Sequence, residues 1–322
     1  VITISHAGYI KRLPVGTYRR QHRGGVGVTA METKGEDFVE HLFVASTHEY
    51  LLFFTNQGRA YWLKVHEIPQ ASRYAKGTAV INLISLQSGE RLSSFVPVKS
   101  FDADKFLVLA TKMGTTKRTS LDEFDSPRKA GLIAITLDEG DEVIQAHITD
   151  GKRELLLFTR LGMAIRFAED QVREVGRSAR GVRGITLDKK DVVIGFELVR
   201  PDESLLTVTS AGFGKRTPAA EYRLQSRGGK GIIIIMVADK GEVIGTRTAT
   251  DKDDVMLITQ EGMVVRSRVK DVRESSRNTQ GVRLIRLQGN DRVSSVASVA
   301  HQEDVEEAPA APAPERCRSA VR

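Results

Sequence analysis

The side chains best suited to chemistry in this sequence are arginines that recur at two fixed positions of an internal repeat. The first position lies four residues after the glycine of a Ser/Thr-x-x-Gly pattern, and Trp62 replaces arginine in the second repeat. Cations at one site of a repeat are suited to binding phosphate groups. We therefore predict that this set binds a polyanion. It comprises Arg12, Arg118, Arg166, Arg216 and Arg266, with Lys11, Lys117 and Lys215 beside them.

The second position lies on a polar stretch, four residues before a further glycine. It is occupied by Arg23, Arg73, Arg128, Arg177, Arg227 and Arg277, with the third member displaced by one residue. Cations repeated around a disc would follow a bent phosphate backbone. The alternative is that the arginines pair with acidic residues of a neighbouring repeat, such as Asp141 or Asp191. For a single arginine the sequence leaves both interpretations open.

The elements that carry these cations form six repeats of about fifty residues. Short apolar runs such as Leu155 to Phe158 precede the Thr-x-x-Gly pattern, and an alternating segment such as Met163 to Phe167 follows it. We expect strands there, because the runs are too short for helices and the alternation has period two. A third strand is predicted after the second glycine. Its core-facing residue is Met31, Ile81, Ile135, Ile185, Ile235 or Ile285.

A turn and a fourth strand, such as Val143 to Ala146, complete each repeat. The pattern predicts an all-β fold over residues 1–300, a propeller-like ring of six four-stranded antiparallel blades with little helix. The remainder, residues 301–322, combines acidic residues with an Ala/Pro run, and we predict that it is disordered. Because the chain begins with Val1, we interpret it as a fragment of a longer polypeptide.

Composition and missing motifs narrow the function. The formal net charge is +7, which favours an anionic partner. The sequence contains no P-loop, no metal-ligand spacing among its histidines and no nucleophile elbow, so we expect no catalytic residue, no metal and no cofactor. Its single cysteine, Cys317, forms no internal disulfide, and this fits a reducing cytoplasm. No apolar run is long enough to span a membrane.

One motif makes the resemblance to a known family specific. The segment Gln21-His22-Arg23-Gly24-Gly25-Val26-Gly27 resembles the box Gln-Arg/Lys-Arg-Gly-Gly-Arg/Lys-Gly. With the six repeats and Gly8-Tyr9-Ile10-Lys11-Arg12, residues 1 to about 300 are similar to the C-terminal domain of the DNA gyrase A subunit. The resemblance implies a β-pinwheel whose blades exchange strands and whose rim bends and wraps double-stranded DNA with a fixed hand.

The same resemblance implies the partners. The full enzyme is an ATP-dependent type IIA topoisomerase that introduces negative supercoils. This non-catalytic domain would act with the gyrase B subunit in addition to the rest of the gyrase A subunit, in an A2B2 assembly. His22 and Val26 stand where the family has cations, and Arg19 and Arg20 lie just upstream. A second box-like copy spans Gln225 to Gly231 and includes Lys230.

Two alternatives to a gyrase domain remain open at the level of the sequence. The first is the C-terminal domain of a topoisomerase IV A-type subunit, which wraps DNA weakly. The second is a protein-binding propeller of the scaffold kind.

Overall fold

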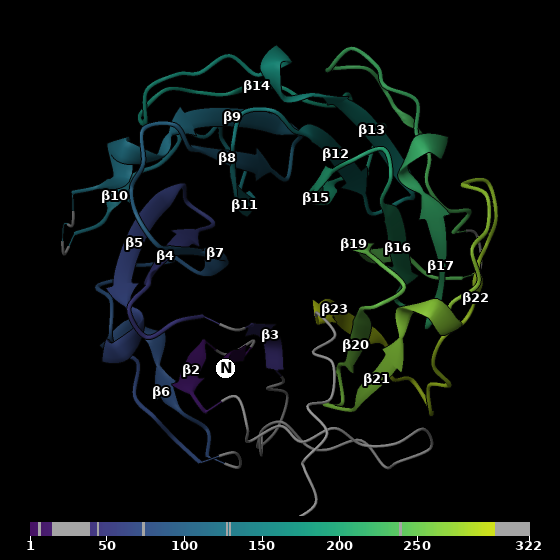
Figure 1. The fold of residues 1–322 in the computed structure, drawn as a ribbon, viewed down its shortest axis with the longest axis horizontal. Coiled ribbons are helices and arrows are strands. Elements are labelled where there is room, and N and C mark those ends of the chain that lie inside the picture. Colours follow the sequence, from purple (N-terminus) through teal and green to yellow (C-terminus); the bar gives the residue numbers. More distant parts are fainter. Residues whose placement is uncertain are drawn as a thin grey trace, which may run out of the picture.

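The protein is a closed ring of β-sheets with the strands arranged around a central channel (Figure 1). The computed structural model describes residues 1–5, 8–14, 39–43, 45–72, 75–126, 128, 130–237 and 240–299. Within these ranges the helical elements are short 3-10 turns, and no helix is long and apolar enough to cross a membrane. The predicted all-β ring of six blades is confirmed.

Five of the sheets have four strands each. The first contains β1 (Ile2–Ser5), β2 (Tyr9–Arg12), β3 (Val39–Phe43) and β6 (Thr78–Ala79), and the second contains β4 (Tyr50–Thr55), β5 (Arg59–Lys64), β7 (Leu92–Val98) and β10 (Leu132–Ile133). The third contains β8 (Phe106–Thr111), β9 (Thr115–Ser120), β11 (Val143–Thr149) and β14 (Val182–Arg183). The fourth contains β12 (Glu154–Thr159), β13 (Met163–Ala168), β15 (Val193–Val199) and β18 (Ile232–Ile233). The fifth contains β16 (Ser204–Thr209), β17 (Phe213–Pro218), β19 (Val243–Ala249) and β22 (Val282–Arg283).

The blades exchange strands, as the family resemblance implied. In each of these five sheets the outermost strand belongs to the following repeat: β14 pairs with β9, and β18 pairs with β13. The sixth sheet consists of β20 (Asp254–Thr259), β21 (Val264–Arg268) and β23 (Val293–Val299) among the described residues. The segment at the corresponding place in the first repeat follows Gly27 and lies outside the described residues. The strand β23 contacts β3, which brings the last blade against the first.

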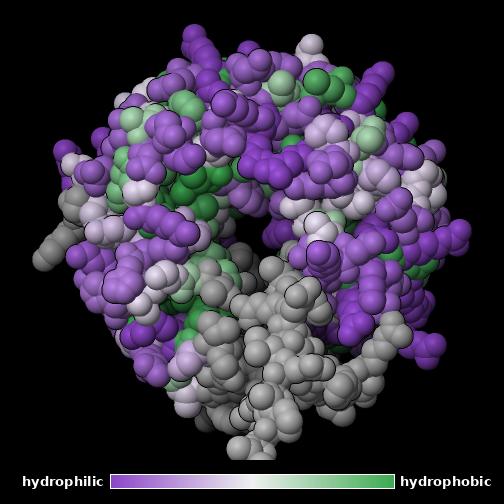
Figure 2. Space-filling model, in the orientation of Figure 1, coloured by the Kyte–Doolittle hydropathy of each residue, from purple (hydrophilic) through white to green (hydrophobic). Residues whose placement is uncertain are grey.

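The hydrophobic core is divided among the blade-to-blade contacts. Alternate residues of one central strand face opposite neighbours: Leu155 and Leu157 of β12 pack with Val108, whereas Leu156 and Phe158 pack with Leu205. Both faces of the strand are therefore buried, which explains its unbroken apolar sequence. Figure 2 shows apolar side chains between the blades and polar side chains over much of this face.

The third strand of the repeat is shorter than the sequence predicted. It spans two residues in each described copy, and the chain then leaves the sheet. Ile135, Ile185 and Ile235 are buried as expected, and Ile285 is half-buried. The prediction is wrong for Ile81, which is 63% exposed, because Val80–Asn82 forms a 3-10 turn instead of continuing the strand. Met31 lies outside the described residues.

A glycine with positive φ closes the hairpin between the first two strands of each repeat. At Gly162, φ is +87°, and a Cβ would lie 2.5 Å from the carbonyl oxygen of Ile235. At Gly289, on a different turn, φ is +54° and a Cβ would meet nothing within 4 Å. Gly162 is thus needed both for its positive φ and for its missing Cβ, whereas Gly289 is needed for its positive φ alone.

We predict that Gly162→Ala destabilises the protein more than Gly289→Ala does. Both variants carry the left-handed backbone cost of roughly 1–2 kcal/mol. Only Gly162→Ala adds a clash with the backbone of the exchanged segment, so its urea unfolding midpoint should be clearly the lower of the two. Equal midpoints would contradict the close approach at Gly162.

Candidate nucleic-acid interface

Each repeat sends a segment across the outer edge of the blade before it. In the fourth repeat, Glu174 bridges to Arg118 at the end of β9, and Arg183 pairs with Thr115 at its start. The chain between them therefore runs along the outside of this blade (Figure 1). Equivalent bridges join Leu224 to Arg166 and Glu274 to Arg216. We call residues 173–183, 223–233 and 273–283 the rim segments.

Each rim segment begins with an exposed arginine that the sequence analysis missed. Arg173, Arg223 and Arg273 directly follow Val172, Tyr222 and Val272, which are buried. Within the described part of the chain, none of the three arginines forms an ion pair or a side-chain hydrogen bond. Their spacing of fifty residues was visible in the sequence, but their position had no glycine motif to mark it.

The rim segments end with a second exposed position. Arg183 and Arg283 occupy it in the fourth and sixth repeats, and Ile133 and Ile233 occupy it in the third and fifth. The two pairing sites on β9, Thr115 and Arg118, are three residue steps apart, which corresponds to about 10 Å at 3.4 Å per residue. Cations are therefore presented near both edges of the rim.

The second predicted arginine set lies on these segments. Arg128 and Arg227 are exposed, and Arg177 and Arg277 are half-buried. The guanidinium of Arg227 donates to the carbonyl oxygens of Gln171 and Arg183, at 3.0 Å each. Arg23 and Arg73 lie outside the described residues, as do Arg19, Arg20 and the whole box-like segment 21–27.

Lys230 of the second box-like copy pairs with Asp188 at 2.7 Å. Both side chains are more than 60% exposed, at 67% and 62%. Ion pairs this exposed contribute little to stability. The Lys230 ammonium can therefore leave Asp188 and bind another anion with little loss of stability.

The arginines of the first predicted set make ion pairs and hydrogen bonds within the ring. Arg166 is 6% exposed, pairs with Glu154 of its own blade and donates to the carbonyl oxygens of Ala219 and Tyr222. Arg12 and Arg216 likewise donate to carbonyl oxygens of the following repeat, those of Ile68 and Val272. These arginines hold successive repeats together.

Arg118 and Arg266 complete this set. Arg118 is 14% exposed, lies over the ring of Phe106 and is 4.0 Å from Glu169. Burial raises the pKa of Glu169. Hydrogen bonds from the Thr149 hydroxyl and the Arg153 N–H oppose this increase. Arg266 is 36% exposed and pairs with Asp254. The prediction of a DNA-binding side chain is wrong for the buried Arg166, and the alternative of acidic pairing describes the set better.

The acidic partners also differ from those suggested by the sequence. Asp141 and Asp191 accept hydrogen bonds from backbone N–H groups of the hairpin turns, at Met113 and Leu161. They therefore shape turns and do not neutralise the repeated arginines. Only the spatial pairing of Glu154, Asp251 and Asp254 with the arginines identifies the true partners.

Lys11, Lys117 and Lys215 are buried, with at most 1% of each exposed, so their prediction as rim cations is wrong. The ammonium of Lys215 donates to the carbonyl oxygens of Ser276 and Arg277 and to the hydroxyl of Thr279. The ammonium of Lys117 donates to the carbonyl oxygens of Ala134 and Arg177. The alternation of side chains along the strand places these lysines inside the blade, although their charge led to the prediction that they lie on the rim.

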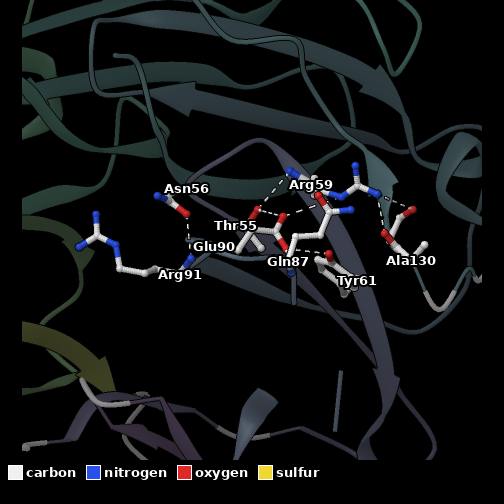
Figure 3. A network of polar contacts seen from close by, with 9 residues as sticks. Thr55, Asn56, Arg59, Tyr61, Gln87, Glu90, Arg91 and Ala130 are labelled. Atoms are coloured by element: carbon white, nitrogen blue, oxygen red, sulfur yellow. Dashed lines mark hydrogen bonds and ion pairs between the residues drawn. The ribbon is translucent and has the colours of Figure 1, made fainter. Parts of the chain in front are cut away.

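The second blade has Tyr61 where the first has Lys11. The Tyr61 hydroxyl donates to Glu90, and burial together with this carboxylate raises the pKa of Tyr61 (Figure 3). Thr55 also donates to Glu90, and the Arg59 Nε lies 3.8 Å from it. The guanidinium of Arg59 then reaches the carbonyl oxygen of Ala130, so an arginine holds the rim of the third repeat.

The sequence model of the family described as "DNA gyrase C-terminal domain, beta-propeller" matches residues 1–46, 49–99, 105–150, 153–200, 203–249 and 253–300. The chain belongs to this family. The six matched segments follow the six sheets of the structure in order.

Curated relatives and solved structures agree with this family. The DNA gyrase A subunits of Haemophilus influenzae and Clostridium acetobutylicum are 48% and 50% identical to it over 184 residues, 57% of this chain. The chain covers only 21% and 22% of their lengths. A structure of a DNA gyrase A C-terminal domain matches with a TM-score of 0.80 and 26% identity, over 92% of this chain and 98% of that chain. The C-terminal domain of a DNA topoisomerase IV matches with a TM-score of 0.75 and 28% identity, over 93% and 92%.

The buried lysines give this gyrase-type domain a pH-dependent stability. Burial lowers the pKa of Lys215 from 10.5 to about 8, the carboxylate of Glu221 opposes the shift, and Arg277 adds to it. Between these two pKa values the unfolded chain binds more protons than the folded chain, so Lys215 makes stability rise with pH.

We predict that the free energy of unfolding of the native protein, minus that of Lys215→Met, increases as the pH rises from 8 to 10. The slope should approach about 1.4 kcal/mol per pH unit. Urea unfolding at a series of pH values measures it. A difference that stays flat or falls with pH would show that Lys215 keeps its ordinary pKa in the folded state.

Proposed function

We propose that this chain is the DNA-wrapping part of a DNA gyrase A subunit. It binds duplex DNA on its outer rim and bends the duplex with a fixed hand, and the complete enzyme uses this wrap and ATP to introduce negative supercoils. The observation that carries the proposal is the set of exposed arginines Arg173, Arg223 and Arg273, which have no acidic partner among the described residues and recur at fifty-residue spacing in the fourth, fifth and sixth repeats.

The rim is the surface of the ring best suited to a polyanion. In the channel, Arg247 of the inner strand β19 pairs with Glu197 of β15 at 3.1 Å, so that charge is already neutralised. His147 of β11 is half-buried there, and desolvation lowers its pKa, which favours the uncharged imidazole at neutral pH. The blade-to-blade surfaces are apolar. The rim segments, in contrast, each begin with an exposed arginine, and two of them also end with one, at Arg183 and Arg283.

The energetics favour several weak contacts over one strong site. Smoothly bending 20–30 base pairs costs on the order of 1–6 kcal/mol. Each phosphate neutralised by a cation contributes a slope of about −0.9 to log affinity against log salt concentration. Cations repeated on successive blades can supply several such contacts along an arc, which holds the duplex bent without reading its sequence.

The partners follow from the share of the relatives that the chain covers. The chain spans about a fifth of the length of the gyrase A subunits that it matches. We therefore assign DNA cleavage and ATP hydrolysis to the B subunit together with the rest of the A subunit. DNA binding alone is assigned to this part, which acts without a cofactor of its own.

Two alternatives give different results in one assay. Nicked plasmid is sealed by ligase in the presence of the chain, and the change in linking number is measured. A gyrase-type domain changes the linking number with one sign. A topoisomerase IV-type domain binds DNA with little change, and a protein-binding propeller shows no salt-dependent DNA binding.

We predict that replacing Arg173, Arg223 and Arg273 together by Ala weakens DNA binding and lowers the salt slope by about 0.9 per lost phosphate contact. The matched control is Arg292→Ala, an exposed arginine just before the inner strand β23. Binding titrations from low to moderate salt measure the slope. An unchanged slope in the triple variant would remove these arginines from the interface.

A second comparison separates the two box-like segments. We predict that replacing Arg19, Arg20 and Arg23 by Ala abolishes the change in linking number while DNA still binds. The reason is that the first blade meets the sixth at the ring closure, where β23 contacts β3.

Replacing Arg227 and Lys230 by Ala should weaken binding but keep the linking-number change. Linking-number assays on both variants measure this. The reverse pattern would assign the wrapping role to residues 225–231. Retention of the change in both variants would refute a box-like role for either segment.

A further inference from the structure

The buried lysines alternate around the ring. They occupy the third residue of the second strand in the first, third and fifth repeats, at Lys11, Lys117 and Lys215. The same position is Tyr61, Ile165 and Val265 in the second, fourth and sixth repeats. The repeat is therefore regular in its backbone and alternating in this one buried side chain.

Each buried lysine holds the rim of the repeat that follows it. Lys11 donates to the carbonyl oxygens of Ser72 and Ala75, at 3.3 and 2.9 Å. Lys117 and Lys215 donate to the carbonyl oxygens of two rim arginines, Arg177 and Arg277. The lysines thus fix the main chain at Arg177 and Arg277, whose side chains are half-buried on the rim.

All three rim segments share a weaker anchor on their other side. In each case a backbone N–H group of the preceding repeat donates to a carbonyl oxygen of the rim segment. The donors are Thr136, Thr186 and Met236, at 3.3, 2.9 and 3.1 Å. Their acceptors are the carbonyl oxygens of Ala179, Gly229 and Thr279. The shared bond is present with or without a lysine, so the lysine is an additional anchor in alternate repeats.

The loop 225–231 is the rim loop that lies over an uncharged residue. A Cβ at Gly229 would lie 3.5 Å from the Cδ1 of Ile165, where the neighbouring blades have the lysine stem. Hydrogen bonds from neutral groups hold its consecutive glycines: the Gly228 N–H donates to the carbonyl oxygen of Gly184 at 2.7 Å, and the Thr186 hydroxyl donates to that of Gly228 at 2.6 Å. The Arg227 side chain is held only through acceptors near the surface.

We propose that Lys117 and Lys215 are positioning residues that preset Arg177 and Arg277 for the DNA backbone, whereas the loop 225–231 is set without a buried ammonium beneath it. The consequence for DNA rests on the DNA binding proposed above, but the clamp itself is a property of the free protein.

Hydrogen exchange on the free protein tests the clamp. In Lys215→Met we expect the amides of residues 275–281 to exchange about tenfold faster, because Met has the length of the lysine stem without its donors. Lys117→Met should do the same for residues 175–181. The matched control is Ile165→Met, the same new residue at the unclamped position, which should leave residues 225–231 unchanged.

If Lys215→Met and Lys117→Met leave their loops as protected as in the native protein, the clamp is refuted. Where Lys215→Met fails to fold, Thr279→Val removes one of its three acceptors and should raise exchange in the same loop. An unchanged loop in that variant equally refutes the proposal.

The DNA readout separates a positioning role from direct contact. Lys215 is buried, so Lys215→Met should leave the salt slope of binding unchanged while reducing the linking-number change at least twofold. A slope smaller by about 0.9 would mean that Lys215 itself meets a phosphate, which refutes the positioning role. Faster exchange in Lys215→Met, combined with no DNA binding by the native protein, would refute the proposed function and leave the clamp standing.

Discussion

The central strand of each blade is apolar on both faces, and no single blade can bury it. Leu155, Leu156, Leu157 and Phe158 are all completely buried, yet they divide between two separate cores, one shared with each neighbouring blade. The hydrophobic effect thus acts across the gaps between blades and not within a sheet. This constraint makes the ring a cooperative structure and leaves the outer edge of each blade to be completed by other means.

Strand exchange completes that edge and builds the candidate DNA surface in one step. Because β14 and β18 come from the following repeat, the chain must cross the outside of each blade to reach them. The crossing segment places Arg173 and Arg223 on the rim, and Arg166 and Lys215 hold such segments from beneath. The buried cations and the exposed cations therefore have complementary roles: the first set positions the backbone, and the second is available to phosphate.

The repeat period and strand patterning were sufficient to predict the ring, because period-two burial depends on local sequence. Side-chain roles were harder to predict. Lys215 and Arg216 are neighbours in one strand, yet both donate to carbonyl oxygens of the following repeat, those of Ser276 and Val272, and neither is the exposed cation that was predicted. Arg173 was missed because it lies outside any glycine motif. Ile81 was assigned to a strand because the 3-10 turn that exposes it depends on packing in the second blade.

Strand exchange also separates the unit of sequence from the unit of structure. One repeat of about fifty residues gives three strands to one sheet and a short fourth strand to the sheet before it. If a whole repeat were lost or duplicated in the gene, every remaining outer strand would still meet a compatible partner, and no new edge would be exposed. The number of blades is then limited by the angle at which neighbouring blades pack, and not by strand pairing. Rings of different circumference, holding different lengths of DNA, are accessible to this architecture by changes of one repeat at a time.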